Sequence, residues 1–514
     1  MLETVKVYVF CCVISASVIE TARILAVFPT PSISHQFAFR PITHELARRG
    51  HDVVVLTTDP AFPKGQAPTN LTEIDVHDIS YDIWKNMQAS HTGDPKDVLK
   101  NIVLMFELMT KTFEKQIQTA EFQRLMKEEN DTFDVVLVEA WVRPTIGLGH
   151  VFKKPLIQIS SFGAVSTQYD YFGAPNHPFL YPSAGRVRVY DMTIWEKLKE
   201  LVKIVFLEWL ISTTEENDND MMKRNFGANL PSTADLFKNI KMVFLNEHQI
   251  WADNHPVPSN IVYIGGIHNR PEKDLPKEIK DFLDSSERGV IYFSFGTNII
   301  PNLLPSEKIQ IMAKVLSSLP YDVLWKWNED VVPTNATNIK FSKWFPQSDL
   351  LRHQKVKLFI TQGGLQSTDE ALNAAVPMLG MPMLGDQWYN VEKYVRFGFG
   401  KQLDIMSLNE EDFRNAVVTI ITNSSFKINA EKMRVLMREH PVEPLDKAVW
   451  WIEHVIQNGG DHLQPFSAGG ISLLEYYEIP LILTMLLTCV IIITLIIAIL
   501  RFILRFLMNG LRKI

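Results

Sequence analysis

Residues 344–387 contain three motifs that decide the fold: WFPQSDLL (344–351), LFITQGGLQSTDE (358–370) and VPMLGMPMLGDQ (376–387). The apolar run at 356–360 predicts a buried parallel strand, since strands covered on both faces are apolar throughout. Gly363 and Gly364 then turn the chain into a helix that carries Ser367 and Glu370. A buried strand that leads through a glycine turn into a helix is the repeating unit of an α/β fold with a parallel sheet.

The turn at 363–364 also has the geometry that binds phosphate. A glycine turn lets backbone amides approach an anion, and the N-terminus of the helix behind it adds about half a positive charge. Glu370, one turn further along, can accept hydrogen bonds from both ribose hydroxyls. Trp344 offers a flat face to a base, a contact of about 1–3 kcal/mol. Two glycines alone usually mark a packing turn, so it is the combination that predicts a nucleotide-sugar site.

Nine residues of the three motifs together resemble the signature of the UDP-glycosyltransferase family: Trp344, Gln347, Gly364, Ser367, Glu370, Pro377, Pro382, Asp386 and Gln387. The resemblance extends over nearly the whole chain and is closest to the membrane-bound animal branch, insect-like in character. It implies that Trp344 and Gln347 hold uracil, Ser367 and the Gly364 amide hold phosphate, Glu370 holds ribose, and Asp386 with Gln387 holds sugar hydroxyls.

Two further donor-site assignments follow from the resemblance. Ser294, Gly296 and Thr297 follow an apolar strand at 290–294, and the family's matching turn lies beside the phosphates. The alternative is that these small residues only end the strand and bind no ligand. Gln362 stands where many members of the family have histidine; it can donate a hydrogen bond to phosphate but carries no titratable charge.

The N-terminal half repeats the α/β rhythm without a Gly-x-Gly-x-x-Gly fingerprint. We expect strands at 24–28, 52–57, 133–138 and 156–159, and a helix over 40–49 with Pro41 in its first turn. The predicted fold is α/β, with two facing Rossmann-like domains of the glycosyltransferase B type and one C-terminal transmembrane helix. The donor then binds the C-terminal domain, and the cleft between the domains is the active site.

His35 and Glu139 are the predicted catalytic residues. His35 follows the first strand and can deprotonate an acceptor hydroxyl near neutral pH. Glu139 ends a central strand and would order the imidazole, although the family commonly has Asp at this place. In-line attack implies inversion of an α-linked donor. The departures at Glu139 and Gln362 leave a second hypothesis open, a non-catalytic luminal protein that binds a UDP-sugar or small molecule on the same fold.

Composition and charge restrict the function classes. The 514 residues suggest two or more domains, and 46% apolar content is ample for packed cores. The net charge of -7 and the lack of a long Lys/Arg run argue against nucleic acid. The three cysteines, Cys11, Cys12 and Cys489, lie in a predicted leader and anchor, so no disulfide or zinc site is expected. We expect no metal and no cofactor beyond the UDP-sugar co-substrate.

Two hydrophobic segments predict the compartment. Residues 1–21 fit a secretory signal peptide, and 480–500 an uncharged membrane-spanning helix of about 30 Å. Basic residues in the tail at 501–514 predict a single-pass type I protein of the endoplasmic reticulum with luminal catalytic domains. Four Asn-x-Ser/Thr triplets, weak support for the lumen because they also arise by chance, mark glycosylation candidates: Asn70, Asn130, Asn335 and Asn423.

The remaining expectations concern domain limits and substrates. An N-terminal acceptor domain is expected over 22–253, a linker over 254–288, a donor domain over 289–443, and a crossover helix with a membrane-proximal segment over 444–479. The apolar run 204–211 is predicted to be a core helix; lining an acceptor pocket or pressing on the membrane are its alternatives. The signature has few cations to pair a C6 carboxylate, which favours UDP-glucose over UDP-glucuronate. The acceptor is expected to be a small lipophilic alcohol or phenol, and a homo-oligomer is left open.

Overall fold

The computed structural model describes residues 21–88, 98–129, 131–164, 168–182, 186, 188–297, 304–464 and 473–511. Its N-terminal domain is built on a seven-stranded parallel sheet in the order β3-β2-β1-β4-β5-β6-β7. The strands are β1 Arg23–Phe28, β2 Asp52–Thr57, β3 Leu71–Asp75, β4 Val135–Glu139, β5 Leu156–Ser160, β6 Ile240–Leu245 and β7 Ile261–Tyr263.

The C-terminal domain has a six-stranded parallel sheet in the order β10-β9-β8-β11-β12-β13. Its strands are β8 Val290–Ser294, β9 Asp322–Lys326, β10 Ile339–Ser342, β11 Val356–Thr361, β12 Met378–Gly380 and β13 Gly400–Gln402. In both sheets the strand order reverses once, between β1 and β4 and between β8 and β11. A ligand crevice opens at such a reversal, outside the carboxyl ends of the strands.

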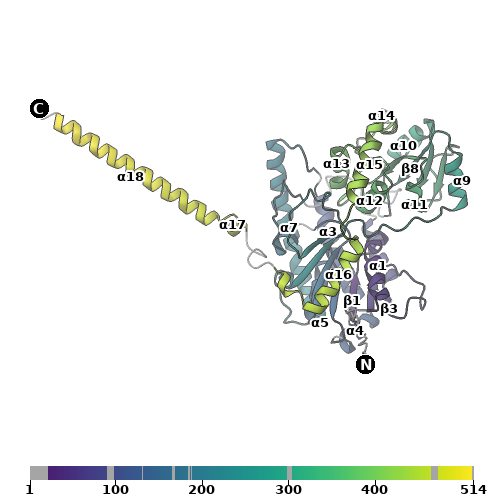
Figure 1. Ribbon diagram of the computed structural model, residues 1–514, viewed down its shortest axis with the longest axis horizontal. Coiled ribbons are helices and arrows are strands. Elements are labelled where there is room, and N and C mark those ends of the chain that lie inside the picture. Colours follow the sequence, from purple (N-terminus) through teal and green to yellow (C-terminus); the bar gives the residue numbers. More distant parts are fainter. Residues whose placement is uncertain are drawn as a thin grey trace, which may run out of the picture.

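Helices cover both sheets (Figure 1). Those of the N-terminal domain are α1 Ile33–Arg48, α2 His77–Gln88, α3 Val98–Ile117, α4 Ala120–Glu128, η2 Arg143–Ile146, α5 Gly147–Phe152, α6 Gln168–Tyr171, α7 Ile194–Phe226 and α8 Thr233–Phe237. Those that follow are α9 Lys277–Ser285, α10 Ser306–Ser318, α11 Gln347–Leu351, α12 Leu365–Asn373, α13 Gln387–Arg396, α14 Glu410–Thr422, α15 Ser424–Arg438, α16 Pro444–Asn458, η4 Asp461–Leu463, α17 Leu473–Tyr476 and α18 Ile479–Leu511.

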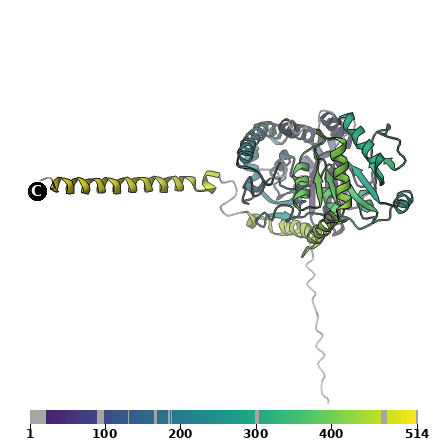
Figure 2. The same ribbon diagram turned by 90° about the horizontal axis from the view of Figure 1, so that it is seen from above.

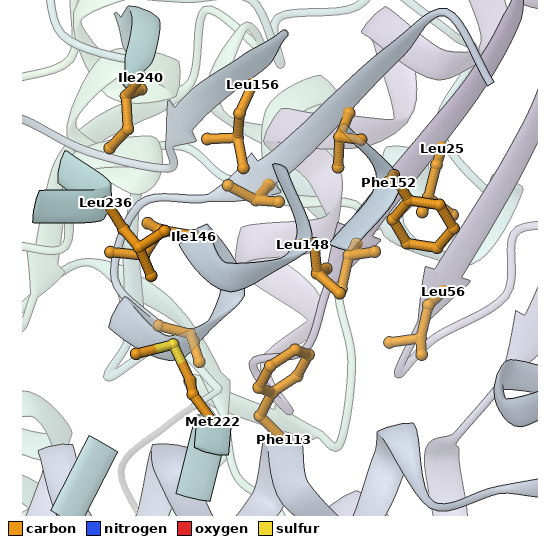
Figure 3. Close-up of a cluster of buried hydrophobic side chains, with 14 of the residues drawn as sticks. Leu25, Leu56, Phe113, Ile146, Leu148, Phe152, Leu156, Met222, Leu236 and Ile240 are labelled. Atoms are coloured by element: carbon orange, nitrogen blue, oxygen red, sulfur yellow. The ribbon is translucent and has the colours of Figure 1, made fainter. Parts of the chain in front are cut away.

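The larger core of the N-terminal domain lies between one face of its sheet and helices α3, α5 and α7. Figure 3 shows strand side chains such as Leu25, Leu56 and Leu156 facing Phe113 of α3 and Met222 of α7. All five are buried, and the apolar strands identified in the sequence supply one side of this layer. Burial on both faces explains why these strands are apolar throughout rather than alternating.

The chain crosses between the domains twice. β7 pairs with β6 in the first sheet, and α9 packs through Ile279 and Leu283 into the core of the second domain. The first crossing is therefore shorter than the expected linker over 254–288. The second lies between α15 and α16, because α16 packs on α1 and buries Val449 and Ile452 in the N-terminal core.

Helix α1 begins seven residues before the predicted start at Arg40, so Pro41 lies inside it and not in its first turn. The early turns are stabilised by burial, since Gln36, Ala38 and Phe39 all face the core and the Phe39 ring stacks on Phe28 at 4.1 Å. Packing offsets the hydrogen bond that Pro41 cannot donate. His35 consequently stands on the first turn of a helix, whereas the predicted helix began five residues after it.

Helix α7 contains the apolar run 204–211, and only its second half is a core helix. Thr214, Asp218, Met221 and Met222 are buried, whereas most apolar side chains between 194 and 209 are exposed. The core-helix prediction is therefore wrong for the first half of α7. The pocket-lining alternative is wrong as well, because no described residue of 169–226 lines the cavity between the domains.

Within the described residues, α18 is the one helix long and apolar enough to cross a membrane, over Ile479–Arg505. None of its most apolar stretch is buried against the two domains, and both views show it projecting away from them (Figures 1 and 2). This length exceeds the predicted 480–500 because the helix continues through Arg501 and Arg505. The predicted signal peptide lies almost entirely outside the described residues.

The glycosylation candidates differ in their surroundings. Asn335 and Asn423 are exposed, and Asn130 lies outside the described residues. Asn70 is partly buried, and its side-chain nitrogen, the atom that would carry a glycan, donates to the Ala47 carbonyl and to the His51 carbonyl at 3.0 Å. Asn70 is thus the least suited of the three described candidates.

Candidate active site

A cavity of about 650 Å³ opens between the two domains at the carboxyl ends of their strands. Each domain contributes residues that follow its strand-order reversal. In the N-terminal domain this is His35 after β1, which contacts the fully buried Glu139 at the end of β4; in the C-terminal domain they are the segments after β8 and β11. All the predicted donor residues line this cavity: Ser294, Gly296, Thr297, Trp344, Gln347, Gln362, Gly364, Ser367, Glu370, Asp386 and Gln387.

His35 and Glu139 form a close pair. His35 Nδ1 lies 2.6 Å from Glu139 Oε1, and Glu139 Oε2 accepts the backbone N–H of Thr30 at 3.1 Å. Glu139 is fully buried, whereas His35 is partly exposed to the cavity. The paired geometry fixes Nδ1–H as the donor to the carboxylate, which leaves Nε2 as the nitrogen available to a substrate proton.

Apolar side chains form the wall of the cavity on the N-terminal side. Trp84 comes from α2, Met105 and Met109 from α3, and Trp141 and Phe162 from the segments after β4 and β5. The Trp141 and Phe162 rings meet edge to face at 5.2 Å, and the Phe162 ring lies 5.9 Å from that of His35. Sequence analysis missed this wall, since its members are spread over eighty residues with no shared motif.

The glycine turn at 363–364, predicted to bind phosphate, has the expected geometry. Gly363 adopts φ +94°, and a Cβ there would collide with Val391, so this position needs glycine. Gly364 is the N-cap residue of α12 and lines the cavity together with Ser367 of the first turn. Across the neighbouring strand, Gly296 lies against the amide nitrogen of Gln362. Gln362 Oε1 is buried and makes no hydrogen bond within the described structure, so this oxygen is an unused acceptor beside the cavity.

Gln347 connects the residues assigned to uracil, phosphate and ribose. Its amide nitrogen donates to Ser367 Oγ at 2.9 Å and to Glu370 Oε2 at 2.7 Å, and its oxygen accepts the Tyr292 hydroxyl at 3.1 Å. Burial raises the pKa of Glu370, and the bond from Gln347 opposes that rise. Trp344 is 56% exposed, so one face of its ring is open for stacking.

Asp386 and Gln387 stand at the start of α13. Burial raises the pKa of Asp386 to about 6, while Asn390 and the charge of His35 across the cleft act in the opposite direction. Gln387 uses its side-chain oxygen to accept the backbone N–H groups of Met383 and Leu384, both at 2.8 Å. Only the amide nitrogen of Gln387 is therefore left for a sugar hydroxyl.

Lys326, at the end of β9, is a donor-side residue that sequence analysis missed. Its Nζ donates to the Gly296 carbonyl at 2.6 Å and lies 5.7 Å from the centre of the Trp344 ring. Burial lowers the pKa of Lys326 to about 8. The side chain brings a positive charge between the predicted positions of the base and the diphosphate. A single lysine at a strand end gave no signal in the sequence.

The described residues contain no group of three or more His, Cys, Asp or Glu side chains placed to hold a metal ion. The predicted donor residues offer backbone amides, side-chain amides, hydroxyls and two carboxylates, and the cationic residues Arg40, Arg270, Lys273 and Lys326 line the same cavity. That metal and cofactor play no part stays a prediction.

Comparisons with known proteins identify the family of the chain. A family model described as "UDP-glucoronosyl and UDP-glucosyl transferase" matches residues 23–514. The ecdysteroid UDP-glucosyltransferase of Spodoptera littoralis nuclear polyhedrosis virus is 34% identical over 484 residues, which are 90% of this chain and 94% of the viral one. UDP-glucosyltransferase 2 of Dactylopius coccus is 29% identical, with 90% of each chain covered.

Solved structures support the fold. The glycotransferase of kitacinnamycin has a TM-score of 0.58 at 17% identity, covering 84% of this chain and 98% of its own. The glycosyltransferase VinC has a TM-score of 0.57 at 15% identity, covering 85% and 100%. Two facing parallel sheets with the cleft between them are the glycosyltransferase B arrangement. With the family model matching nearly the whole chain, this protein is a glycosyltransferase that uses a UDP-sugar, and it belongs to the UDP-glucuronosyl and UDP-glucosyl transferase family.

Proposed function

We propose that the chain transfers glucose from UDP-glucose to a hydroxyl group of a small lipophilic acceptor, with inversion at the anomeric carbon. The observation that supports this is the 2.6 Å pair of His35 and Glu139, which faces the predicted donor residues across the cleft. A base in that position, ordered by a buried carboxylate, distinguishes a transferase from a protein that only binds the nucleotide.

The proposed step moves one proton and exchanges one bond. His35 Nε2 takes the acceptor O–H proton while the acceptor oxygen bonds to the anomeric carbon, and the bond from that carbon to the β-phosphate oxygen breaks. UDP leaves with the bonding electrons, and the Gly364 region, Ser367 and Gln362 stabilise its charge. The Glu139 carboxylate stabilises the imidazolium that forms. Attack from the side opposite the leaving group turns an α-linked donor into a β-glycoside.

Donor and acceptor classes have separate support. Relatives named UDP-glucosyltransferases favour glucose, and the Asp386 carboxylate near the sugar position would repel the C6 carboxylate of glucuronate. The apolar wall around Trp141 and Phe162 favours a lipophilic acceptor. The viral relatives are named for ecdysteroids, so a steroid is one acceptor to test.

The membrane topology is part of the same proposal. α18 would anchor the chain, and the basic residues at its end, Arg501 and Arg505, favour a cytoplasmic tail with the catalytic domains in the lumen of the endoplasmic reticulum. Exposed Asn335 and Asn423 are then the first glycosylation sites to examine. Self-association into a homo-oligomer stays open.

The decisive experiment compares His35→Ala with His150→Ala, a matched change at an exposed histidine far from the cavity. Full-length protein in microsomes is assayed for UDP release with an aliphatic alcohol acceptor, whose hydroxyl needs a base. We expect His35→Ala to lower the rate by about 10²–10⁴ with UDP affinity retained. Full activity of His35→Ala would overturn the base assignment, and absence of transfer in the wild type with all acceptors would favour a binding protein.

A further inference from the structure

The first half of α7 exposes an unusually large apolar surface. Trp195 is 71% exposed, Val202 63% and Trp209 58%, and Leu198, Leu201 and Val205 are exposed between them. Spacings of three and four residues place most of these side chains along one side of the helix. Contiguous apolar surface of this kind on a soluble domain marks a site of contact with another protein, a ligand or a membrane.

Helix α7 is capped at its start and anchored to the N-terminal domain in its second half. At its start, Thr193 and Glu196 form a reciprocal cap: the Thr193 N–H donates to Glu196 Oε2 at 2.7 Å, and Thr193 Oγ1 accepts the Glu196 N–H at 3.3 Å. Further along, buried Asp218 pairs with Arg143 at 2.6 Å. The exposed apolar side is therefore presented by a fixed helix and not by a frayed end.

Charges around the stripe suit a lipid surface. Exposed Lys197, Lys199 and Lys203 alternate with the apolar side chains. Glu196 pairs with Arg188 at 2.7 Å, and Glu200 pairs with Arg186 at 3.0 Å and with Lys203 at 3.5 Å, which leaves Lys197 and Lys199 as the lysines for which no such ion pair is found in the described structure. Lysines beside an apolar face attract anionic headgroups, and tryptophans favour the boundary between headgroups and acyl chains.

The chain carries a candidate membrane anchor of its own. α18 is long and apolar enough to span a bilayer, and eight residues separate Gln464 from Leu473 at the start of α17. Eight residues reach at most about 30 Å, so the two domains stay next to the surface that α18 enters. Both views place α7 on the flank of the domains nearest α17 and α18 (Figures 1 and 2).

We propose that the first half of α7 lies in the membrane interface, with its apolar side in the boundary between headgroups and acyl chains. This rests on the proposed anchoring by α18 and goes beyond it, because it fixes which face of the catalytic domains meets the bilayer. α7 packs against α3, and α3 carries Met105 and Met109 of the apolar cavity wall. The acceptor side of the cleft therefore lies next to the phase in which lipophilic acceptors dissolve.

The test uses single-cysteine labelling, for which this chain is well suited. Its three cysteines, Cys11, Cys12 and Cys489, are replaced by serine or alanine in the full-length protein. Val202→Cys then places a polarity-sensitive fluorophore on α7. Val331→Cys is the matched control, a valine that is 83% exposed in the C-terminal domain. Both proteins are reconstituted into vesicles of phosphatidylcholine and phosphatidylserine that carry a quencher on the acyl chains.

We expect the label at 202 to be quenched several-fold more than the label at 331, with a blue-shifted emission only at 202. Equal weak quenching at both positions, in protein that floats with the vesicles, would overturn the α7 contact and leave the anchor intact. Protein that does not float would overturn both. Disulfide cross-linking of Val202→Cys between two chains would show instead that α7 is a contact between copies, which also overturns the proposal.

A second variant tests the functional consequence. Val202→Glu puts a charge on the stripe without touching the cavity, so the KM for UDP-glucose should not change. The KM for an acceptor that partitions into the membrane should rise several-fold, while that for a water-soluble phenol should not. An equal change for both acceptors would contradict delivery through the bilayer.

Discussion

The side-chain amide of Asn390 donates a hydrogen bond to the Asp386 carboxylate at 2.8 Å, one turn along α13. The same nitrogen donates to the Gly363 carbonyl at 2.9 Å, and the Asn390 oxygen accepts the indole N–H of Trp251 at 2.8 Å. One buried side chain thus connects the predicted sugar-binding carboxylate, the glycine turn at 363–364 and the segment between β6 and β7.

Replacing Asn390 by alanine should weaken use of the sugar donor. The loss of a hydrogen bond to a charged group costs about 1.5–3 kcal/mol, or about 10- to 100-fold in affinity. We expect the KM for UDP-glucose to rise by that factor and the affinity for UDP to change less, because UDP lacks the sugar. The exposed Asn415→Ala on α14 serves as the control. Parallel losses for both ligands would mean that Asn390 only supports the local fold.

Substitutions at Glu139 should distinguish the effect of the side chain's charge on transfer from the effect of its length. Glu139→Gln removes the charge that stabilises the imidazolium, so it should slow transfer more than Glu139→Asp, which keeps it. With His35→Ala already present, Glu139→Gln should cost little more, since the carboxylate acts through the imidazole. Rates are measured at saturating donor, with thermal unfolding as the check on the buried carboxyl. Additive losses in the double variant would argue for two independent roles.

Lys326 should give donor binding a dependence on alkaline pH. Its pKa of about 8, lowered by burial, means that the cation is present below pH 8 and lost as the pH rises above it. UDP-glucose affinity, measured by calorimetry, should fall between pH 7.5 and 9 in the wild type. Lys326→Arg should flatten this profile, because arginine stays charged, and Lys326→Met should bind weakly throughout. A steep profile in Lys326→Arg would assign the titration to another group.

Asp386 should make UDP-glucose affinity fall on the acidic side of the pH profile, opposite to the effect of Lys326. With its pKa raised to about 6 by burial, the carboxylate is charged above pH 6 and becomes protonated as the pH falls below it. A charged carboxylate accepts sugar hydroxyls more strongly than a neutral one, so UDP-glucose affinity should fall from pH 7 to 5. Asp386→Asn should bind more weakly at neutral pH and lack this inflection. Glu370 is present in both proteins, so any titration of its carboxyl group contributes equally to the two pH profiles.

The sequence predicted those features that depend on local chemistry. The glycine turn at 363–364, the strand before it and the helix with Ser367 and Glu370 all stand as expected, because φ +94° at Gly363 and the capping of α12 are decided within a few residues. The His35–Glu139 pair was also predictable, since β1 and β4 are neighbours at the strand-order reversal and both residues follow their carboxyl ends.

Features that depend on contacts across the chain were missed. Trp251 and Asn390 are 139 residues apart, and no sequence pattern around either residue indicates that the two are in contact. The start of α1 was misplaced because Pro41 suggested a first turn. Burial of Ala38 and Phe39 instead extends the helix toward the N-terminus and offsets the hydrogen bond that Pro41 cannot donate. The exposed side of α7 was missed because composition alone cannot say which side of an apolar helix faces the protein.

The double crossing between the domains has a mechanical consequence. A single connection would let one domain swivel freely on the other, whereas two connections, between β7 and α9 and between α15 and α16, define a line. We therefore expect relative motion of the domains to be mainly a rotation about that line, and Arg49 keeps the second connection in place by holding α16 to the N-terminal domain through Glu453 at 3.2 Å and Asp446 at 2.9 Å. Such a rotation would move His35 toward or away from Asp386 across the cavity that both residues line.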